Sequence, residues 1–202
     1  MTTFDFGFGP VPAHQHPNGG GWVADTAKVA DTAYVGPDAQ VSGNAWVFDN
    51  AQVSDNAQVY GKAQVFGNAQ VFGNALVSDK ARVFDNAQVS GEAWVFANAW
   101  VSDNARVFEN ARVYGEAWVF GKAQVFENAQ VYGNAQVYGN AQVCSDAVVY
   151  GNAWVYGNAQ VCSDARVCSD ARVYGNAEIG DDVKEDMFIE MNGKRYKLVE
   201  VE

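Results

Sequence analysis

The sequence predicts an all-β fold that repeats one short strand many times, and two regular series of residues predict it. Valine stands at every sixth position from Val23 to Val173, and Ile179 closes the series. Alanine recurs at the same interval from Ala27 to Ala177, always two places before one of these residues. Residues two apart point to the same side of a strand, whereas a helix would need apolar residues three and four apart. Such a short, unbroken period is typical of repeat proteins, whose units share one core.

Each hexad is predicted to form a strand followed by a corner. In residues 135–140, Ala and Val point inward, Gln and Tyr point outward, and Gly-Asn forms the corner, because these two residue types tolerate a left-handed backbone. So short a strand cannot bury its Ala/Val face alone, and neighbouring units must therefore coil around a shared core. Three hexads per coil make a triangular prism. The 27 Val/Ile positions then give about nine coils, a rod ~43 Å long at the usual strand spacing.

The run V-x-G-N-A-x resembles the hexapeptide repeat of left-handed parallel β-helix proteins, with an aliphatic residue at position one and a small residue at position five. The left hand of the coil is what this resemblance implies, since parallel crossovers are right-handed as a rule. Within that class the chain resembles uncharacterised bacterial and phage solenoids described as acyltransferase-like. The lead-in HPNGGGWVADTA, residues 16–27, carries this narrower resemblance.

The chain is predicted to be a single domain with three parts: an N-terminal arm or cap (1–21), the solenoid (22–180) and a C-terminal capping β-hairpin (181–202). The alternating Phe4, Phe6 and Phe8 of the arm are expected to pair as a strand or to cover the open end of the rod. Asn192-Gly193 is a strong hairpin turn signal and would place Glu190 opposite Arg195. A cap is needed because bare strand edges invite end-to-end stacking.

Sorting the outward residues by the eighteen-residue coil gives three unequal columns. The first, which we call the Trp-rich face, carries eleven aromatic residues: Trp46, Phe48, Phe66, Phe84, Trp100, Trp118, Phe120, Tyr138, Trp154, Tyr156 and Tyr174. The second is mainly glutamine, expected to hydrogen-bond as a ladder along the rod, and the third mixes aromatic residues with arginine. So large an outward aromatic patch indicates an interface. Stacking of these rings on one another is the simpler alternative.

A line of carboxylates, which we call the acidic edge, follows the second column at the corner. Its candidate binding residues are Asp55, Glu92, Glu109, Glu127, Asp146 and Asp164. A regular line of this kind could attract a basic partner protein. Solubility and protection against sideways aggregation are the more ordinary explanation of such a line, and the favoured one.

Composition bounds the partners and the compartment. A net charge of −11 and a pI near 4.5 argue against direct binding to nucleic acid or to an anionic membrane. Three cysteines, an odd number, fit a reducing cytoplasm better than a disulfide framework. Cys144 and Cys162 are eighteen residues apart, so a disulfide between adjacent coils is geometrically allowed; free thiols are the favoured expectation.

Catalysis is not expected. Hexapeptide acyltransferases, as the resemblance implies, use a histidine base and loops that leave the coil, but no histidine follows His16 and no loop interrupts residues 21–180. His14 and His16 could hold a metal; a solvated loop is the favoured interpretation, because no Cys, Asp or Glu lies close to them in sequence. We therefore expect no catalytic residue, no metal site and no cofactor.

The sequence favours a non-catalytic, rigid rod that acts as a structural or protein-interaction element through its Trp-rich face. A homo-oligomer, either a dimer or a trimer, is the expected partner state. An acidic decoy or nucleic-acid mimic that binds a basic partner protein is the alternative, and a hexapeptide-family acyltransferase is the second alternative. The contact candidates are Trp46, Phe48, Trp100, Trp118, Phe120, Trp154 and Tyr156.

Overall fold

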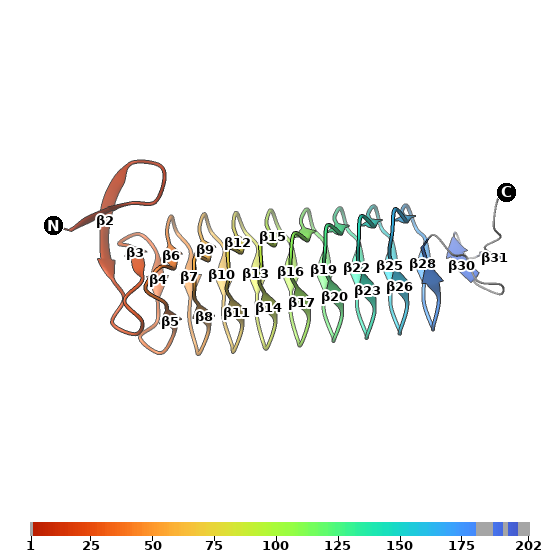
Figure 1. The fold of residues 1–202 in the computed structure, drawn as a ribbon, viewed down its shortest axis with the longest axis horizontal. Helices are drawn as coiled ribbons and strands as arrows, with labels where there is room; N and C mark the ends of the chain where they lie inside the picture. The colour runs from red at the N-terminus through yellow and green to blue at the C-terminus, as the bar shows by residue number, and fades with distance from the viewer. Residues whose placement is uncertain (1, 181–187, 192–193, 198–202) are drawn as a thin grey trace.

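The computed structural model describes residues 2–180, 188–191 and 194–197. The described chain forms a straight rod of stacked coils, with an N-terminal hairpin at one end and a pair of short strands at the other (Figure 1). Each coil contributes one strand to each of three sheets, which contain eleven, nine and eleven strands. No helix occurs among the described residues.

The first sheet carries the Trp-rich face. Its strands are β4 (Lys28–Val29), β7 (Trp46–Val47), β10 (Gln64–Val65), β13 (Arg82–Val83), β16 (Trp100–Val101), β19 (Trp118–Val119), β22 (Gln136–Val137), β25 (Trp154–Val155), β28 (Arg172–Val173), β30 (Phe188–Met191) and β31 (Lys194–Lys197).

The second sheet carries the glutamine column. Its strands are β5 (Tyr34–Val35), β8 (Gln52–Val53), β11 (Gln70–Val71), β14 (Gln88–Val89), β17 (Arg106–Val107), β20 (Gln124–Val125), β23 (Gln142–Val143), β26 (Gln160–Val161) and β29 (Glu178–Ile179).

The third sheet begins with the N-terminal arm. Its strands are β1 (Thr3–Asp5), β2 (Pro10–Gln15), β3 (Trp22–Ala24), β6 (Gln40–Val41), β9 (Gln58–Val59), β12 (Leu76–Val77), β15 (Trp94–Val95), β18 (Arg112–Val113), β21 (Gln130–Val131), β24 (Val148–Val149) and β27 (Arg166–Val167).

Within the solenoid every strand pairs in parallel with the strand three further along, so each residue lies beside the one eighteen positions later. Trp100 pairs with Trp118, and Gln70 with Gln88. The predicted all-β parallel solenoid of about nine coils, and its sorting into three columns, is therefore confirmed. The left hand and the triangular section of the coil stay predictions.

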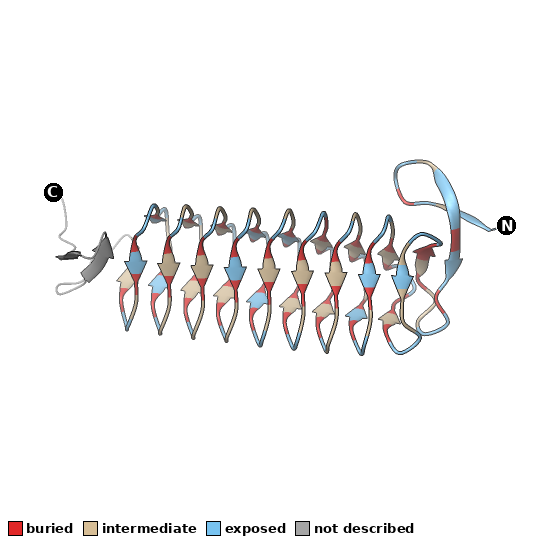
Figure 2. Ribbon diagram, turned by 180° about the vertical axis from the view of Figure 1, so that it is seen from behind, coloured by how far each residue is buried: buried red, intermediate tan, exposed pale blue. Residues whose placement is uncertain are grey.

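The core consists of the two series that define the repeat. Alanines from Ala33 to Ala159 and valines from Val35 to Val161 are all completely buried. Figure 2 shows this core as red segments inside every coil, with the outward residues tan or blue. Burial decreases at the two ends, where Val29 and Ile179 are only partly covered. Burying a valine side chain stabilises the fold by ~1.5 kcal/mol or more, and the stack repeats that gain in every hexad.

The N-terminal arm is folded rather than loose. β1 pairs antiparallel with β2, and β2 pairs antiparallel with β3, so the arm extends the third sheet. Phe6 is buried against Ala13 and Ala24, and Phe4 stacks on Trp22 with ring centroids 4.6 Å apart. The expectation that the phenylalanine segment pairs as a strand is confirmed for Phe4. Phe8, by contrast, is 84% exposed.

At the other end, β30 pairs antiparallel with both β28 and β31. Glu190 lies opposite Arg195, the register expected for a two-residue turn between these strands. The turn residues, 192–193, and the segment 181–187 lie outside the described residues.

Candidate functional site

All seven contact candidates lie on the first sheet, on strands β7, β16, β19 and β25 or directly after them. Trp46 and Trp118 are 41% and 43% exposed, and the others are half-buried. Their rings stack along the rod: centroids lie 5.1 Å apart for Phe48 and Phe66 and 4.9 Å apart for Trp100 and Trp118. The simpler alternative, in which the aromatic residues stack on one another, therefore describes much of this face.

Cations from adjacent coils cover three of the four tryptophans. The Lys28 ammonium lies 4.7 Å from the Trp46 ring centroid, and the Arg172 guanidinium lies 4.8 Å from that of Trp154. Arg82 lies 5.0 Å from Trp100. Attraction between a cation and a ring face contributes about 0.5–1 kcal/mol at an exposed site. Three tryptophans of the face therefore have a cationic group over one face of the ring.

The third sheet is more similar to the Trp-rich face than its mixed column suggests. Trp94 is 43% exposed, and the Arg112 guanidinium lies 5.3 Å from its ring. Phe96, Tyr114, Tyr132 and Tyr150 form a continuous stack with centroids 4.8 to 5.2 Å apart. The exposed tryptophans are therefore divided between two faces.

Burial within these stacks changes the acidity of two tyrosines. Burial, and secondarily the neighbouring phenol of Tyr132, raises the pKa of Tyr114 above its ordinary value of 10.0. The pKa of Tyr138, on the first sheet, is raised in the same way by burial and then by Tyr156. In both tyrosines an arginine opposes the shift only in part.

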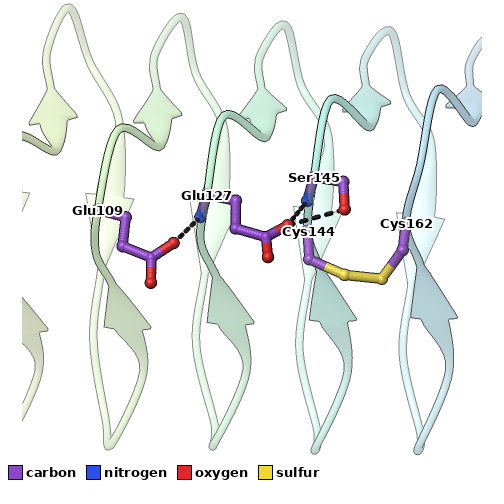
Figure 3. Close-up of a disulfide and its surroundings, with 5 residues drawn as sticks. All are labelled: Glu109, Glu127, Cys144, Ser145 and Cys162. Atoms are coloured by element: carbon purple, nitrogen blue, oxygen red, sulfur yellow. Dashed lines mark hydrogen bonds between the residues drawn. A yellow bond between two sulfur atoms is a disulfide. The ribbon is translucent and has the colours of Figure 1, made fainter.

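The acidic edge divides into two kinds of carboxylate. Asp55 accepts a hydrogen bond from the backbone N–H of Gly73 on the next coil, at 2.9 Å. Glu109 accepts one in the same way from Glu127, which in turn accepts from the N–H and hydroxyl of Ser145 (Figure 3). Half of the predicted binding carboxylates are therefore used by the fold itself.

The remaining residues of the edge occupy the second corner position. Asp146 accepts a hydrogen bond from the side-chain amide of Asn128, at 3.1 Å. Glu92 and Asp164 are exposed. All six residues of the edge are exposed, and four of them, Asp55, Glu109, Glu127 and Asp146, also accept hydrogen bonds from a neighbouring coil.

Hydrogen bonds from a backbone N–H of the next coil to a carboxylate recur at many corners, and the sequence analysis did not predict them. Seven acidic residues have a left-handed backbone, with φ between 54° and 60°: Asp49, Asp55, Asp79, Asp85, Asp103, Glu109 and Glu127. Each accepts a hydrogen bond from the backbone N–H eighteen residues later. The sequence signal for these bonds is an Asp or Glu at the first corner position, which glycine fills in many other hexads.

The predicted glutamine ladder is sparse, and asparagine supplies the ladder instead. Gln88 donates to Gln70 at 3.3 Å on the second sheet. At the corners, side-chain amides bond from coil to coil in many places: Asn56 to Asn74, Asn68 to Asn86, Asn110 to Asn128, Asn134 to Asn152, Asn140 to Asn158, and Asn158 to Asn176. The amides thus bind neighbouring coils to each other at the corners.

The expectation of free thiols at Cys144 and Cys162 is wrong. The two residues form a disulfide between adjacent coils, with Cα atoms 4.6 Å apart (Figure 3). Parallel stacking in register brings the two Cα atoms within the range a disulfide needs. Cys168 is free and half-buried, and a hydrogen bond with it raises the pKa of the Tyr150 phenol.

The histidines are not in a solvated loop, so that expectation is also wrong. His16 is buried, and its Nε2–H donates to the carbonyl of Ala33 at 3.0 Å. His14 Nδ1 lies 2.9 Å from a carboxylate oxygen of Asp25, a residue eleven positions away in sequence. Both side chains fasten the arm to the first coil. No group of three or more metal-ligating side chains occurs within the described part of the chain.

Two hollows lie at the N-terminal end. One, of about 520 Å³, is lined mainly by apolar residues of the arm, including Phe6, Phe8 and Val11. The other, of about 530 Å³, lies beside β4 and is lined by His14, Val23, Ala27, Lys28, Val29, Ala30, Trp46 and Phe48. The second hollow therefore joins the end of the rod to the start of the Trp-rich face.

Among the residues that the structure describes, no helix is long and apolar enough to cross a membrane.

Comparison with known proteins supports the repeat architecture. Six segments of the chain match a family model described as the YdcK beta solenoid repeat: 39–55, 51–67, 69–84, 99–115, 129–145 and 141–157. No match was found among curated proteins. The family match and the sheets together support a repeat β-solenoid protein, and they assign no activity to it.

Proposed function

We propose that the chain is a non-catalytic, rigid β-solenoid that serves as a structural or protein-interaction rod, with the Trp-rich face as its contact surface. The left hand and triangular section of its coils, and the role of the C-terminal hairpin as a cap over β28, are parts of this proposal. So is association of copies through the Trp-rich face, as a dimer or a trimer.

The continuity of the coils carries the proposal. Backbone hydrogen bonds join each coil to the next along all three sheets, and corner amides and aromatic stacks repeat the connection outside the core. Loops that could build a reaction site are absent from residues 22–180, where every connection is a short corner. A lattice of this kind holds outward side chains at fixed spacing, as a rigid contact surface needs.

The two alternatives receive less support. An acidic decoy needs free carboxylates, but Asp55, Glu109 and Glu127 already accept backbone hydrogen bonds. An acyltransferase needs an accessible histidine base. His16 is buried and bonded to the carbonyl of Ala33, so only His14, which lies beside Asp25 on the arm, is exposed.

The experiment replaces the two stacked tryptophans at the centre of the face. Trp100→Glu with Trp118→Glu places two carboxylates where a partner would bury rings, and should dissociate side-by-side oligomers while leaving the coils folded. A dimer contact of ~800 Å² per partner is within reach of a face of this length. Light scattering at tens of micromolar measures the mass, electron microscopy shows side-by-side contact, and circular dichroism checks the strands.

The matched control is Leu76→Glu with Trp94→Glu, a neighbouring pair on the third sheet. It adds the same charge to adjacent coils on another face and should leave the oligomer intact. A parent protein without side-by-side association, or equal dissociation by both pairs, would contradict the Trp-rich face as the contact between copies.

A further inference from the structure

The two ends of the rod have complementary steps. At the N-terminal end the third sheet extends beyond the first coil by two strands, β2 and β1, whereas the first sheet stops at β4. At the C-terminal end the first sheet extends beyond the last coil by two strands, β30 and β31, whereas the third sheet stops at β27. The two projections lie at opposite ends of the rod in Figure 1. The N-terminal end therefore projects by two strands in the third sheet, where the C-terminal end has no extra strand. The C-terminal end projects by two strands in the first sheet, where the N-terminal end has none.

Strand direction is compatible with joining these ends. β30 runs antiparallel to β28 and β31 antiparallel to β30, so β31 runs in the same direction as the strands of the solenoid. In the same way β2 reverses β3 and β1 reverses β2, so β1 also runs in the solenoid direction. If a second copy is placed along the same axis, β31 of one copy and β1 of the other would each run parallel to the strand that it meets. Every strand pair within the coils is parallel in the same way.

β4 is the uncovered edge at the N-terminal end. β3 is covered by β2, and β5 is covered by the segment 16–21, with Val35 bonded to Asn18 and Gly21 through its backbone. In the described part of the chain β4 pairs on one side only, with β7. Val29 of β4 is accordingly only partly covered and lines the hollow of about 530 Å³. An unpaired edge beside an apolar hollow is the arrangement that accepts an added strand.

We propose that copies of this chain stack head to tail, with β31 of one copy on β4 of the next and β27 of the first copy on β1 of the next. In both sheets two strands then separate the last coil of one copy from the first coil of the next. The distance between these coils is three strand spacings, ~14 Å, in both sheets, so both continue without a mismatch. Because the contact joins different surfaces of each copy, it does not close and produces a filament.

Net charge does not select this contact. Residues 1–60 have a formal charge of 1 − 6 = −5, and residues 181–202 have one of 4 − 7 = −3. β31 itself contributes three cations, Lys194, Arg195 and Lys197. The matching number and direction of the strands at the two ends favour head-to-tail contact over head-to-head contact. The inference rests on the proposed rod and is independent of the Trp-rich face.

Two variants test the contact from its two sides. Val29→Pro removes an edge N–H, and proline is tolerated on an edge strand, so the coils should stay folded. Lys194→Glu, Arg195→Glu and Lys197→Glu together replace the three cations of β31 with carboxylates, which would repel the acidic N-terminal end of the next copy. The control, Arg106→Glu, Arg112→Glu and Arg166→Glu, makes the same change of charge on the faces of the solenoid. Sedimentation over about two decades of concentration, ~1 to ~100 µM, measures the mass of the assemblies. Electron microscopy shows whether the rods are joined end to end or side by side.

The parent and the control should form end-to-end chains whose mean mass keeps rising with concentration. Both test variants should lose these chains with unchanged circular dichroism, and any side-by-side contact through the Trp-rich face should remain. A parent that forms no end-to-end chains at any concentration would overturn the proposal, and the hairpins would then be end caps only. End-to-end chains that persist in both test variants would also overturn it. The Trp100→Glu and Trp118→Glu pair leaves end-to-end chains intact, so the two proposals fail separately.

Discussion

At the scale of single residues, the corners explain how the chain tolerates a left-handed backbone without glycine. An L residue other than Gly is disfavoured there, and Asp and Asn are the types that adopt it most readily. In this protein the seven acidic residues with positive φ gain a hydrogen bond to the next coil in return. The corner therefore stabilises the stack as well as turning the chain.

Ala97 is the exception that allows a test. It has φ 60° but no side-chain acceptor, although its own N–H donates to Asp79. Ala97→Asp should supply an acceptor for the N–H of Gly115 and raise the free energy of unfolding by about 1 kcal/mol. For a chain of this size that is a rise of about 2–4 °C in Tm.

Ala97→Gly is the control for this substitution, because glycine removes the strain of the positive φ at this position without adding a hydrogen-bond acceptor. Thermal unfolding followed by circular dichroism compares the two variants. If Asp stabilises no more than Gly, the carboxylate caps contribute nothing and only backbone strain matters at these corners.

The residues of the core were predictable for a simple reason. Ala and Val two residues apart lie on the same side of a strand, so a six-residue period places all of them on the inner side of the coil. Ala105 and Val107 are fully buried, as expected. The caps, the buried His16 and the disulfide were not predictable in the same way. Each depends on a contact with a neighbouring coil or with the arm, and whether that contact forms is decided by side-chain conformations that a repeat pattern does not specify.

At the scale of structural elements, the tyrosine stacks should make stability depend on pH. A raised pKa means that the folded protein holds the phenol proton more tightly than the unfolded chain does. The contribution of Tyr114 and Tyr138 is therefore fully present below the ordinary pKa of 10.0 and is lost as pH rises through the raised value. Denaturant unfolding between about pH 9 and about pH 11 should show this loss in the parent.

Tyr114→Phe with Tyr138→Phe removes the two titrating groups and keeps the stacked rings. Over the same interval the double variant should lose less stability than the parent. Equal losses would mean that burial in the stacks does not favour the neutral phenols.

The disulfide links the two coils that contain β23 and β26, near the C-terminal end, where burial of the core decreases. A cross-link that closes a loop of this length is expected to contribute about 3 kcal/mol, chiefly by restricting the unfolded chain. Cys162→Ser, or reduction of the parent, should lower the free energy of unfolding by about that amount and speed amide hydrogen exchange in β26 and β29.

Cys168→Ser is the matched control, since Cys168 forms no disulfide. Serine keeps a hydrogen-bonding group beside Tyr150, so this variant should change the free energy of unfolding by less than about 1 kcal/mol and leave hydrogen exchange in β26 and β29 unchanged. If reductant leaves the unfolding of the parent unchanged, the predicted contribution of the cross-link is wrong.

At the scale of the whole molecule, the repeat determines the architecture of the coils, whereas the two ends depend on residues outside the repeat. Strand order, the eighteen-residue register and the inward and outward faces followed from the six-residue period and were predictable. The ends were predictable only in part. The sequence indicated the register of Glu190 and Arg195, but not which sheet each end extends, because residues 1–21 and 188–197 lie where the period does not operate. The Trp-rich face was located correctly as a column on one sheet, whereas the cations that cover its rings and the similar third sheet came only from the stacked geometry.

A rod of this kind has a continuous core, so the position of a substitution along it should govern its cost. Ala105 lies in a central coil and is fully buried, whereas Ala177 lies in the last coil and is 9% exposed. Ala105→Leu forces extra methylene groups between coils that cannot move apart, and overpacking of this kind costs about 1–3 kcal/mol. Ala177→Leu can expand toward the end of the stack, and it should cost less.

Repeat proteins respond to such changes through nearest-neighbour contacts, so the central substitution should also weaken the cooperation between the two halves of the rod. Chemical denaturation should show a lower midpoint for Ala105→Leu, with a broader transition than for Ala177→Leu. Hydrogen exchange would place the weakened region at coils that flank β17. If both variants unfold with the same midpoint and the same steepness, the coils are not tightly coupled along the axis, and the rod is not the rigid element that its proposed function requires.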